Sequence, residues 1–165
     1  MSETIERALE VARKAHGNQM YGIYPYEFHL KQTLKVAQSH NLPEEIQVSC
    51  ILHDTIEDTS LSYNDIKKAF GTEVAEIVYA VTDELGRNRK ERKKKTYPKI
   101  RKNVGAILVK LCDRVANVRH SLLYDSQLYK MYLNEHNHFI DNVVSTRFNK
   151  IDDLCLELSL MFEEE

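Results

Sequence analysis

One stretch of the chain has to lie at the centre of any fold that the chain adopts. A helix start at Asn41-Leu42-Pro43 leads into residues 44–54, which are apolar on most sides. A helix of that kind must be covered by neighbouring elements, because it has no face suited to water. The stretch nevertheless ends in a polar pair, His53-Asp54, and the acids Glu57-Asp58 follow one helical turn later. Since residues four apart share a helix face, we expect an imidazole and three carboxylates to crowd together there.

The remaining sequence favours further helices around this one. Glycine and proline are sparse, with five and three in 165 residues, and no alternating run of strand length is convincing. Ser62-x-x-Asp65 resembles a helix-capping arrangement, and Pro98 is expected to interrupt the basic segment 87–102. Apolar periodicity predicts the other helices over residues 3–16, 28–40, 62–71, 72–81, 104–119, 127–139 and 141–162. We therefore predict a single all-α domain over residues 1–165, with seven to nine helices and no substantial sheet.

Composition and charge narrow the class of protein. Apolar residues make up 42% of the chain and the net charge is -2, which is ordinary for a soluble globular protein and does not favour nucleic acid. The N-terminus is polar and acidic, and no apolar run approaches membrane-spanning length. The three cysteines are far apart, which fits a reducing compartment. We expect a cytoplasmic protein without a membrane or nucleic-acid partner, and a homo-oligomer is compatible with these observations.

Two more polar residues are candidates for the same site, one at the start of a helix and one where an apolar helix should continue the core. His29 directly follows the Tyr24-Pro25-Tyr26 turn, and Asp113 ends an apolar helical segment that begins at Ile107. An unpaired aspartate among apolar neighbours would be costly, so it needs a partner. Together with His53 and Asp54, these residues would form a mixed nitrogen and oxygen site. Such a site suits Mn²⁺, Fe²⁺ or Mg²⁺ better than structural zinc.

Three further residues lie one helical turn from the candidate ligands. Glu57 and Asp58 could position or deprotonate an attacking water. Asn117 lies one turn beyond Asp113, on the same face. The pattern as a whole indicates metal-assisted hydrolysis, whereas a His-Asp dipeptide alone would carry little weight.

These motifs resemble a known family. The order His29, His53-Asp54 and Asp113 looks like the HD phosphohydrolase superfamily. Residues 53–59, 81–83 and 110–119, together with Ala15-His16-Gly17 and Pro25-Tyr26-x-x-His29, resemble the RelA/SpoT hydrolase domain. The resemblance covers about residues 5–120, and the length leaves no room for a synthetase or regulatory domain. The chain is therefore similar to the single-domain small alarmone hydrolases.

The resemblance implies a specific chemistry. His29, His53, Asp54 and Asp113 would bind one Mn²⁺, and Glu57 and Asp58 would serve the attacking water. The reaction would release pyrophosphate from the 3′ side of guanosine tetra- or pentaphosphate. Asn117 would contact the nucleotide. The segment 87–102 carries ten basic residues and one acid, and it would attract the other phosphates, through residues that include Arg89, Lys90, Arg92 and Lys93.

One loop departs from the family pattern. The family shows Gly-Gln-x-Arg-Lys before its Pro-Tyr turn, whereas this chain reads Gly17-Asn18-Gln19-Met20-Tyr21-Gly22, without either basic residue. Tyr21 or Tyr24 could stack on a nucleotide base in their place. Two alternatives therefore stay open. The chain could hydrolyse another nucleotide, such as NADPH or a nucleoside phosphate, or it could be an antitoxin-like binding partner on the same scaffold.

Overall fold

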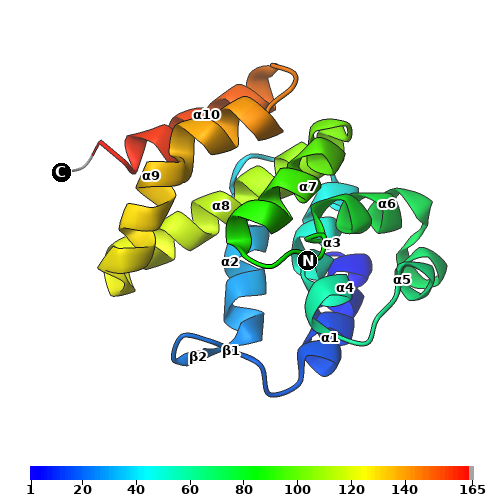
Figure 1. Cartoon of the computed structure of the whole chain (residues 1–165). Helices are drawn as coiled ribbons and strands as arrows, with labels where there is room; N and C mark the ends of the chain where they lie inside the picture. The colour runs from blue at the N-terminus through cyan, green and yellow to red at the C-terminus, as the bar shows by residue number, and fades with distance from the viewer. Residues whose placement is uncertain (164–165) are drawn as a thin grey trace.

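The computed structural model describes residues 1–163, and within them the fold is almost entirely helical (Figure 1). Nine of its helices have eight or more residues, and α4 is a single turn. The helices are α1 (Glu3–His16), α2 (Tyr26–Ser39), α3 (Glu44–Leu52), α4 (Thr55–Asp58), α5 (Tyr63–Phe70), α6 (Thr72–Val81), α7 (Arg89–Arg101), α8 (Val104–Tyr124), α9 (Ser126–Val143) and α10 (Asn149–Leu160). The predicted all-α class and number of helices are confirmed.

The sheet is limited to a hairpin of two short strands between α1 and α2. Strands β1 (Met20–Tyr21) and β2 (Tyr24–Pro25) are antiparallel, with Tyr21 opposite Tyr24. Gly22, in the turn between them, has a φ of 58°, a left-handed conformation that glycine adopts without steric cost. The hairpin therefore projects Tyr21 and Tyr24 beside the start of α2.

Helix α3 is central, as its apolar sequence predicts. Ile46 and Cys50 belong to one buried cluster, which continues into α2 and α6–α10. Val48, Ile51 and Leu52 belong to a second cluster, shared with α1, α2, α5 and α6. Because α3 packs in both clusters, it is held from two sides. The position of His53, which follows Leu52, is therefore well defined.

The long helix α8 crosses the middle of the molecule, with α9 and α10 on one side and α1, α5 and α6 on the other (Figure 1). It comes close to α6 and α3 at Gly105, where an added Cβ would lie 2.5 Å from Cδ1 of Ile77 and 3.2 Å from Cδ1 of Ile46. A residue without a side chain is needed for this approach. The first turn of α8 is thereby fixed against α6 and α3.

Two predicted helix boundaries are wrong, and one predicted cap is confirmed. Pro98 does not interrupt the basic segment, because α7 continues through it while Tyr97 and Ile100 anchor the helix in the core. The predicted break near residue 140 falls instead after Val143, since Phe139 and Val143 are both fully buried on one face of α9. Ser62 and Asp65 do form a capping box at the start of α5.

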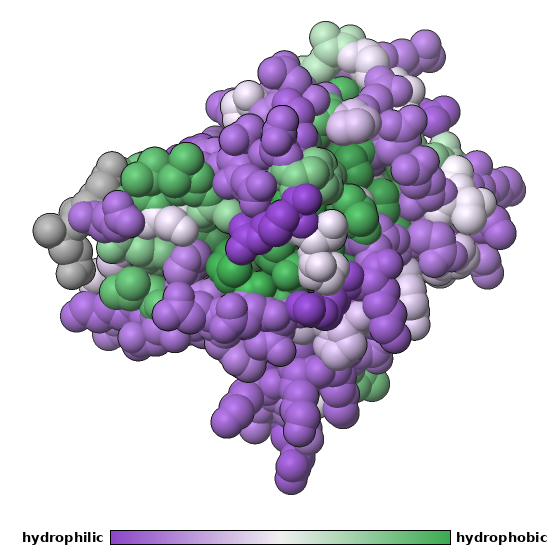
Figure 2. All heavy atoms as spheres, turned by 90° about the horizontal axis from the view of Figure 1, so that it is seen from above, coloured by the Kyte–Doolittle hydropathy of each residue, from purple (hydrophilic) through white to green (hydrophobic). Residues whose placement is uncertain are grey.

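The surface seen from above is mostly polar, and apolar side chains gather beside the C-terminal end of the chain (Figure 2). The exposed apolar residues of α10 include Leu156 and Leu160. All three cysteines are free and buried, as expected of small apolar groups. Within residues 1–163, no helix combines the length and apolar character needed to cross a membrane.

Candidate metal centre and hydrolytic site

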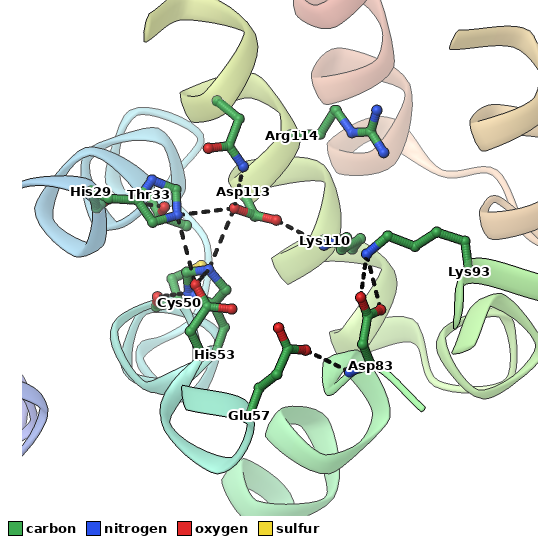
Figure 3. Close-up of polar contacts among 12 residues, drawn as sticks. His29, Thr33, Cys50, His53, Glu57, Asp83, Lys93, Lys110, Asp113 and Arg114 are labelled. Atoms are coloured by element: carbon green, nitrogen blue, oxygen red, sulfur yellow. Dashed lines mark hydrogen bonds and ion pairs between the residues drawn. The ribbon is translucent and has the colours of Figure 1, made fainter. Parts of the chain in front are cut away.

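Three side chains from separate parts of the chain converge in the interior (Figure 3). His29 lies in the first turn of α2, His53 directly follows α3, and Asp113 lies in the middle of α8. Each offers one ligand atom, and these atoms lie within 4.8 Å of one another. Oδ1 of Asp113 is 3.1 Å from Nε2 of His29 and 3.4 Å from Nε2 of His53. The structure thus brings together three of the four predicted ligands from distant parts of the chain.

The fourth predicted ligand, Asp54, borders this cluster. Its Oδ2 is 2.9 Å from Nε2 of His53 and 4.0 Å from Nε2 of His29. The same oxygen accepts a hydrogen bond from the hydroxyl group of Tyr26, the first residue of α2. Burial alone would raise the pKa of Asp54, but the facing imidazoles of His53 and His29 hold it below its usual range. Asp54 is therefore an ionised carboxylate that faces both imidazoles.

The hydrogen bonds of His53 test whether these residues fit a cation. Its Nδ1 lies 2.7 Å from the carbonyl oxygen of Cys50 and must donate to it, which leaves Nε2 as the ring atom that faces the carboxylates. That Nε2 is buried and, although it lies 2.9 Å from Oδ2 of Asp54, it makes no well-directed hydrogen bond within residues 1–163. Burial lowers the pKa of His53, but Asp54 and Asp113 together raise it well above its usual value. The two carboxylates therefore favour a positive charge at Nε2. A histidine that binds a metal commonly donates its other ring N–H to a backbone carbonyl, as His53 does here.

Further contacts orient Asp113. Lys110, one turn earlier on α8, donates a 2.9 Å hydrogen bond to Oδ2, and Asn117, one turn later, donates a 2.8 Å hydrogen bond to Oδ1. Burial raises the pKa of Asp113, but Lys110 and His53 hold it well below its usual range. Asn117 also accepts a 2.6 Å hydrogen bond from the hydroxyl of Tyr21. The predicted substrate contacts Asn117 and Tyr21 thus lie beside the candidate ligands.

The expected continuous helix through His53-Asp54 and Glu57-Asp58 is interrupted, although the backbone N–H of Asp58 still donates to the carbonyl of Asp54 at 2.9 Å. Helix α3 ends at Leu52, and α4 begins at Thr55. The break is stabilised because the hydroxyl of Thr55 donates to the carbonyl of Leu52 at 2.7 Å, while His53 occupies the carbonyl of Cys50.

As a result, the two acids form hydrogen bonds with different parts of the chain. Oε1 of Glu57 accepts a 2.7 Å hydrogen bond from the backbone N–H of Asp83, and Oδ2 of Asp58 accepts a 2.9 Å hydrogen bond from Gln19. Glu57 points toward the cluster from below (Figure 3). Burial raises the pKa of Glu57, although the Asp83 N–H partly opposes this shift. Glu57 therefore has the electrostatic surroundings of a group that takes up a proton.

Fewer basic side chains of helix α7 are free to bind a phosphate than its sequence indicates. Arg89 is held by two hydrogen bonds to Glu135, of 2.8 and 3.0 Å, and Glu135 also binds Arg114 at 3.2 Å. Lys93 pairs with Asp83 at 2.7 Å. Lys90 lines a cavity of about 400 Å³ between α7 and α9, and none of the candidate ligands lines that cavity. A role for Arg89 and Lys90 in substrate binding stays a prediction.

A second cavity, of about 300 Å³, adjoins Tyr21 on the hairpin side. Its aromatic lining comes from Tyr21, Tyr24, His120 and Tyr124. The rings of Tyr21 and His120 lie 4.6 Å apart between centroids, and those of His120 and Tyr124 lie 4.7 Å apart. The Tyr21 ring also stacks on the ring of His29, with centroids 4.5 Å apart. Tyr21 therefore connects the candidate metal ligands to an aromatic pocket.

Sequence reasoning did not assign three of these contributors. Tyr26 lies one turn before His29 on the same helix, so its spacing could have identified it as a neighbour of the site. Lys110 has the same relation to Asp113. Gln19 lies in a turn between α1 and β1, and no periodic pattern links it to Asp58, which is 39 residues away. Only the fold brings Gln19 and Asp58 together.

Comparisons with known proteins agree with this geometry. A family model described as HD domain matches residues 8–130. The guanosine-3′,5′-bis(diphosphate) 3′-pyrophosphohydrolase of Aquifex aeolicus is 37% identical over 125 residues, which cover 72% of this chain and 18% of that protein. The guanosine-3′,5′-bis(diphosphate) 3′-pyrophosphohydrolase MESH1 of Drosophila melanogaster is 36% identical over 77 residues, covering 46% of this chain and 43% of that protein. The chain therefore spans less than half of these curated relatives.

A solved structure agrees over nearly the whole chain. It belongs to a study of a metazoan ortholog of SpoT that hydrolyzes ppGpp, and it is 26% identical to this chain with a TM-score of 0.82. The alignment covers 99% of this chain and 96% of that chain. The likeness therefore includes the hairpin and the C-terminal helices as well as the central motifs.

Proposed function

Because the chain belongs to the HD domain family, we propose that it hydrolyses the 3′-pyrophosphate of guanosine tetra- or pentaphosphate, giving GDP or GTP and pyrophosphate. The observation that carries this proposal is the buried cluster of His29, His53 and Asp113, with the ionised Asp54 beside it. The whole-chain likeness to a ppGpp-hydrolysing protein supports the choice of substrate. The cytoplasm is the expected location.

The four candidate ligands would hold one divalent cation. When bound, this cation supplies Lewis-acid stabilisation of the phosphoryl oxygens, and we propose Mn²⁺, with Fe²⁺ or Mg²⁺ as alternatives. The residues that surround the ligands keep them in place. Lys110 and Asn117 orient Asp113, Tyr26 orients Asp54, and the Cys50 carbonyl fixes the ring of His53.

Glu57 is proposed as the group that accepts a proton from the attacking water. Its pKa is raised by burial, which moves the carboxylate toward the proton affinity that a base needs near neutral pH. The water oxygen would form a bond to the 3′-phosphorus, the bond from that phosphorus to the 3′-oxygen would break, and the 3′-oxygen would take up one proton. Asp58 is proposed to assist, held in place by its hydrogen bond from Gln19.

The aromatic pocket is proposed to bind the base of the nucleotide. Stacking on Tyr24, His120 or Tyr124 would replace the basic pair that the hairpin loop lacks. Tyr21 and Asn117 lie between this pocket and the ligands, where the ribose of a nucleotide would pass. Since aromatic stacking tolerates several bases, a different nucleotide such as NADPH is the second candidate substrate. An antitoxin-like binding role would require no proton acceptor such as Glu57.

The test uses purified protein with Mn²⁺ and guanosine tetraphosphate, with NADPH and nucleoside phosphates in parallel. We expect GDP and pyrophosphate in equal amounts. Asp54→Ala should lose bound metal and activity, whereas Glu57→Gln should keep the metal and lose at least about 100-fold in kcat. Asp153→Asn, an exposed acid on α10, is the matched control. Metal-loaded protein that leaves guanosine tetraphosphate intact but cleaves another nucleotide would refute this substrate.

A further inference from the structure

The turn between α1 and the hairpin makes a chain of side-chain contacts that ends at Asp58. Nδ1 of His16 lies 2.7 Å from Oε1 of Gln19, and Nε2 of Gln19 donates a 2.9 Å hydrogen bond to Oδ2 of Asp58. His16 is the last residue of α1 and is only 7% exposed. A buried imidazole is thus connected, through one amide, to a carboxylate of the hydrolytic site.

The direction of these hydrogen bonds is fixed by chemistry. A carboxylate can only accept, so the Gln19 group that faces Asp58 must be the NH₂. Its carbonyl oxygen then faces His16, and Nδ1 of His16 must carry a proton in order to donate to it. The other ring nitrogen, Nε2, is buried without a hydrogen-bond partner within residues 1–163. His16 therefore has one strong polar contact, and that contact sets the orientation of the Gln19 amide.

The Gln19 side chain is not needed to shape its own loop. The backbone N–H of Gln19 donates to the carbonyl of His16 at 3.0 Å, and its carbonyl accepts from the N–H of Tyr26 at 3.0 Å. The backbone thus ties the end of α1 to the start of α2 without help from the amide. The ring of Tyr26 also packs on the ring of His16, 4.6 Å away between centroids, which holds the imidazole in place. The side-chain amide of Gln19 is left free to bind Asp58.

From this geometry we propose that His16 and Gln19 are positioning residues that hold the Asp58 carboxylate in one orientation for hydrolysis. Asp58 ends a helix of four residues, and its side chain has substantial exposure, so without a partner it would occupy several rotamers. The amide of Gln19 selects one of them, and His16 prevents the amide from flipping. This inference deepens the proposed function and rests on it, because the orientation of Asp58 affects hydrolysis only if the chain is a hydrolase.

Kinetics test the proposal. Gln19→Leu removes both hydrogen bonds, and Gln19→Glu keeps an acceptor for His16 but removes the donor to Asp58. Both should lower kcat by roughly 10- to 100-fold, the range found for partners that orient active-site groups, with bound metal and KM unchanged. Gln38→Leu, an exposed glutamine on α2, is the matched control and should behave as the wild type. An unchanged kcat, or a loss of bound metal, would overturn the proposal.

A double-mutant cycle separates positioning from a structural effect. If Gln19 acts through Asp58, then Gln19→Leu should change kcat less than twofold in an Asp58→Ala background. Full additivity of the two losses would overturn the proposal, because Gln19 would then act elsewhere.

A nuclear magnetic resonance measurement tests the same contacts without any turnover. In ¹⁵N spectra of the wild type, His16 should be in the form with a proton on Nδ1, assigned by comparison with His16→Gln. The side-chain amide resonance of Gln19 should shift in Asp58→Ala. A proton on Nε2 of His16, or an unmoved Gln19 amide, would overturn the proposal. Failure of guanosine tetraphosphate hydrolysis by the wild type would instead overturn only the proposed function.

Discussion

Replacing Tyr26 with phenylalanine removes a single hydroxyl from beside the candidate metal ligands. That hydroxyl donates to Oδ2 of Asp54, the oxygen that also faces Nε2 of His53 at 2.9 Å. The ring itself packs on His16 and lies edge-on to His29, with centroids 5.7 Å apart, and a phenylalanine ring retains both contacts. The substitution therefore tests the hydrogen bond with little effect on packing.

The expected magnitude follows from the charge of the acceptor. A hydrogen bond to an ionised group contributes about 1.5–3 kcal/mol, and about 1.4 kcal/mol corresponds to a factor of ten in affinity. Asp54 is mostly buried and its pKa is held low, so water cannot fully replace the missing donor. Tyr26→Phe should thus weaken Mn²⁺ binding by roughly 10- to 100-fold, the range typical of residues that orient metal ligands.

The assay is a competition titration of Mn²⁺ against a fluorescent chelator, performed on the wild type and on Tyr26→Phe. Tyr79→Phe, which removes the hydroxyl of a half-exposed tyrosine on α6, serves as the control. Thermal unfolding without metal should differ little between the two variants. Unchanged Mn²⁺ affinity in Tyr26→Phe, or an equal loss in the control, would refute the view that this hydroxyl orients a ligand.

Two further predictions concern charge and packing. Burial and the neighbouring Lys110 lower the pKa of Lys93 to about 8, so Lys93 is charged below that pH and neutral above it. If it attracts phosphate, kcat/KM should fall above about pH 8, and a Lys93→Met variant should lack that limb in a pH–rate profile. Separately, Gly105→Ala places a Cβ 2.5 Å from Cδ1 of Ile77, and overpacking of this kind costs about 1–3 kcal/mol against at most about 1 kcal/mol gained in helix propensity. Urea unfolding should show a lower midpoint, and an unchanged or higher one would contradict the packing described for α8.

Much of the fold could be predicted because its elements are local. The two-sided apolar pattern of α3 predicts a central helix, and Ser62 with Asp65 predicts the start of α5. The boundary at Pro98 could not be predicted in this way. Its tolerance depends on Tyr97 and Ile100 being anchored by α8 and α9, and no local pattern contains that information.

Some residues of the candidate site could also be predicted from the sequence, and others could not. His29, His53 and Asp113 stand out in sequence because each places a polar group where a helix should be buried, and the fold brings them together. Gln19 has no such signal, because a glutamine in a turn is ordinary. For Arg89 the sequence is misleading in the other direction. The basic segment indicates a free cation, but Arg89 forms two hydrogen bonds with Glu135 on α9. Pairing between distant segments decides which charges remain available.

The break after Leu52 explains how two acids so close in sequence can have different roles. On a continuous helix, Glu57 would lie over His53, and its carboxylate would compete for the same cation. In the structure, Glu57 instead accepts a hydrogen bond from the Asp83 backbone, and Asp58 accepts one from Gln19. One acid then has a raised pKa, which suits proton transfer, and the other is held by a neutral amide. Substitutions that restore helix across residues 53–55 should therefore impair hydrolysis even though every candidate ligand is retained.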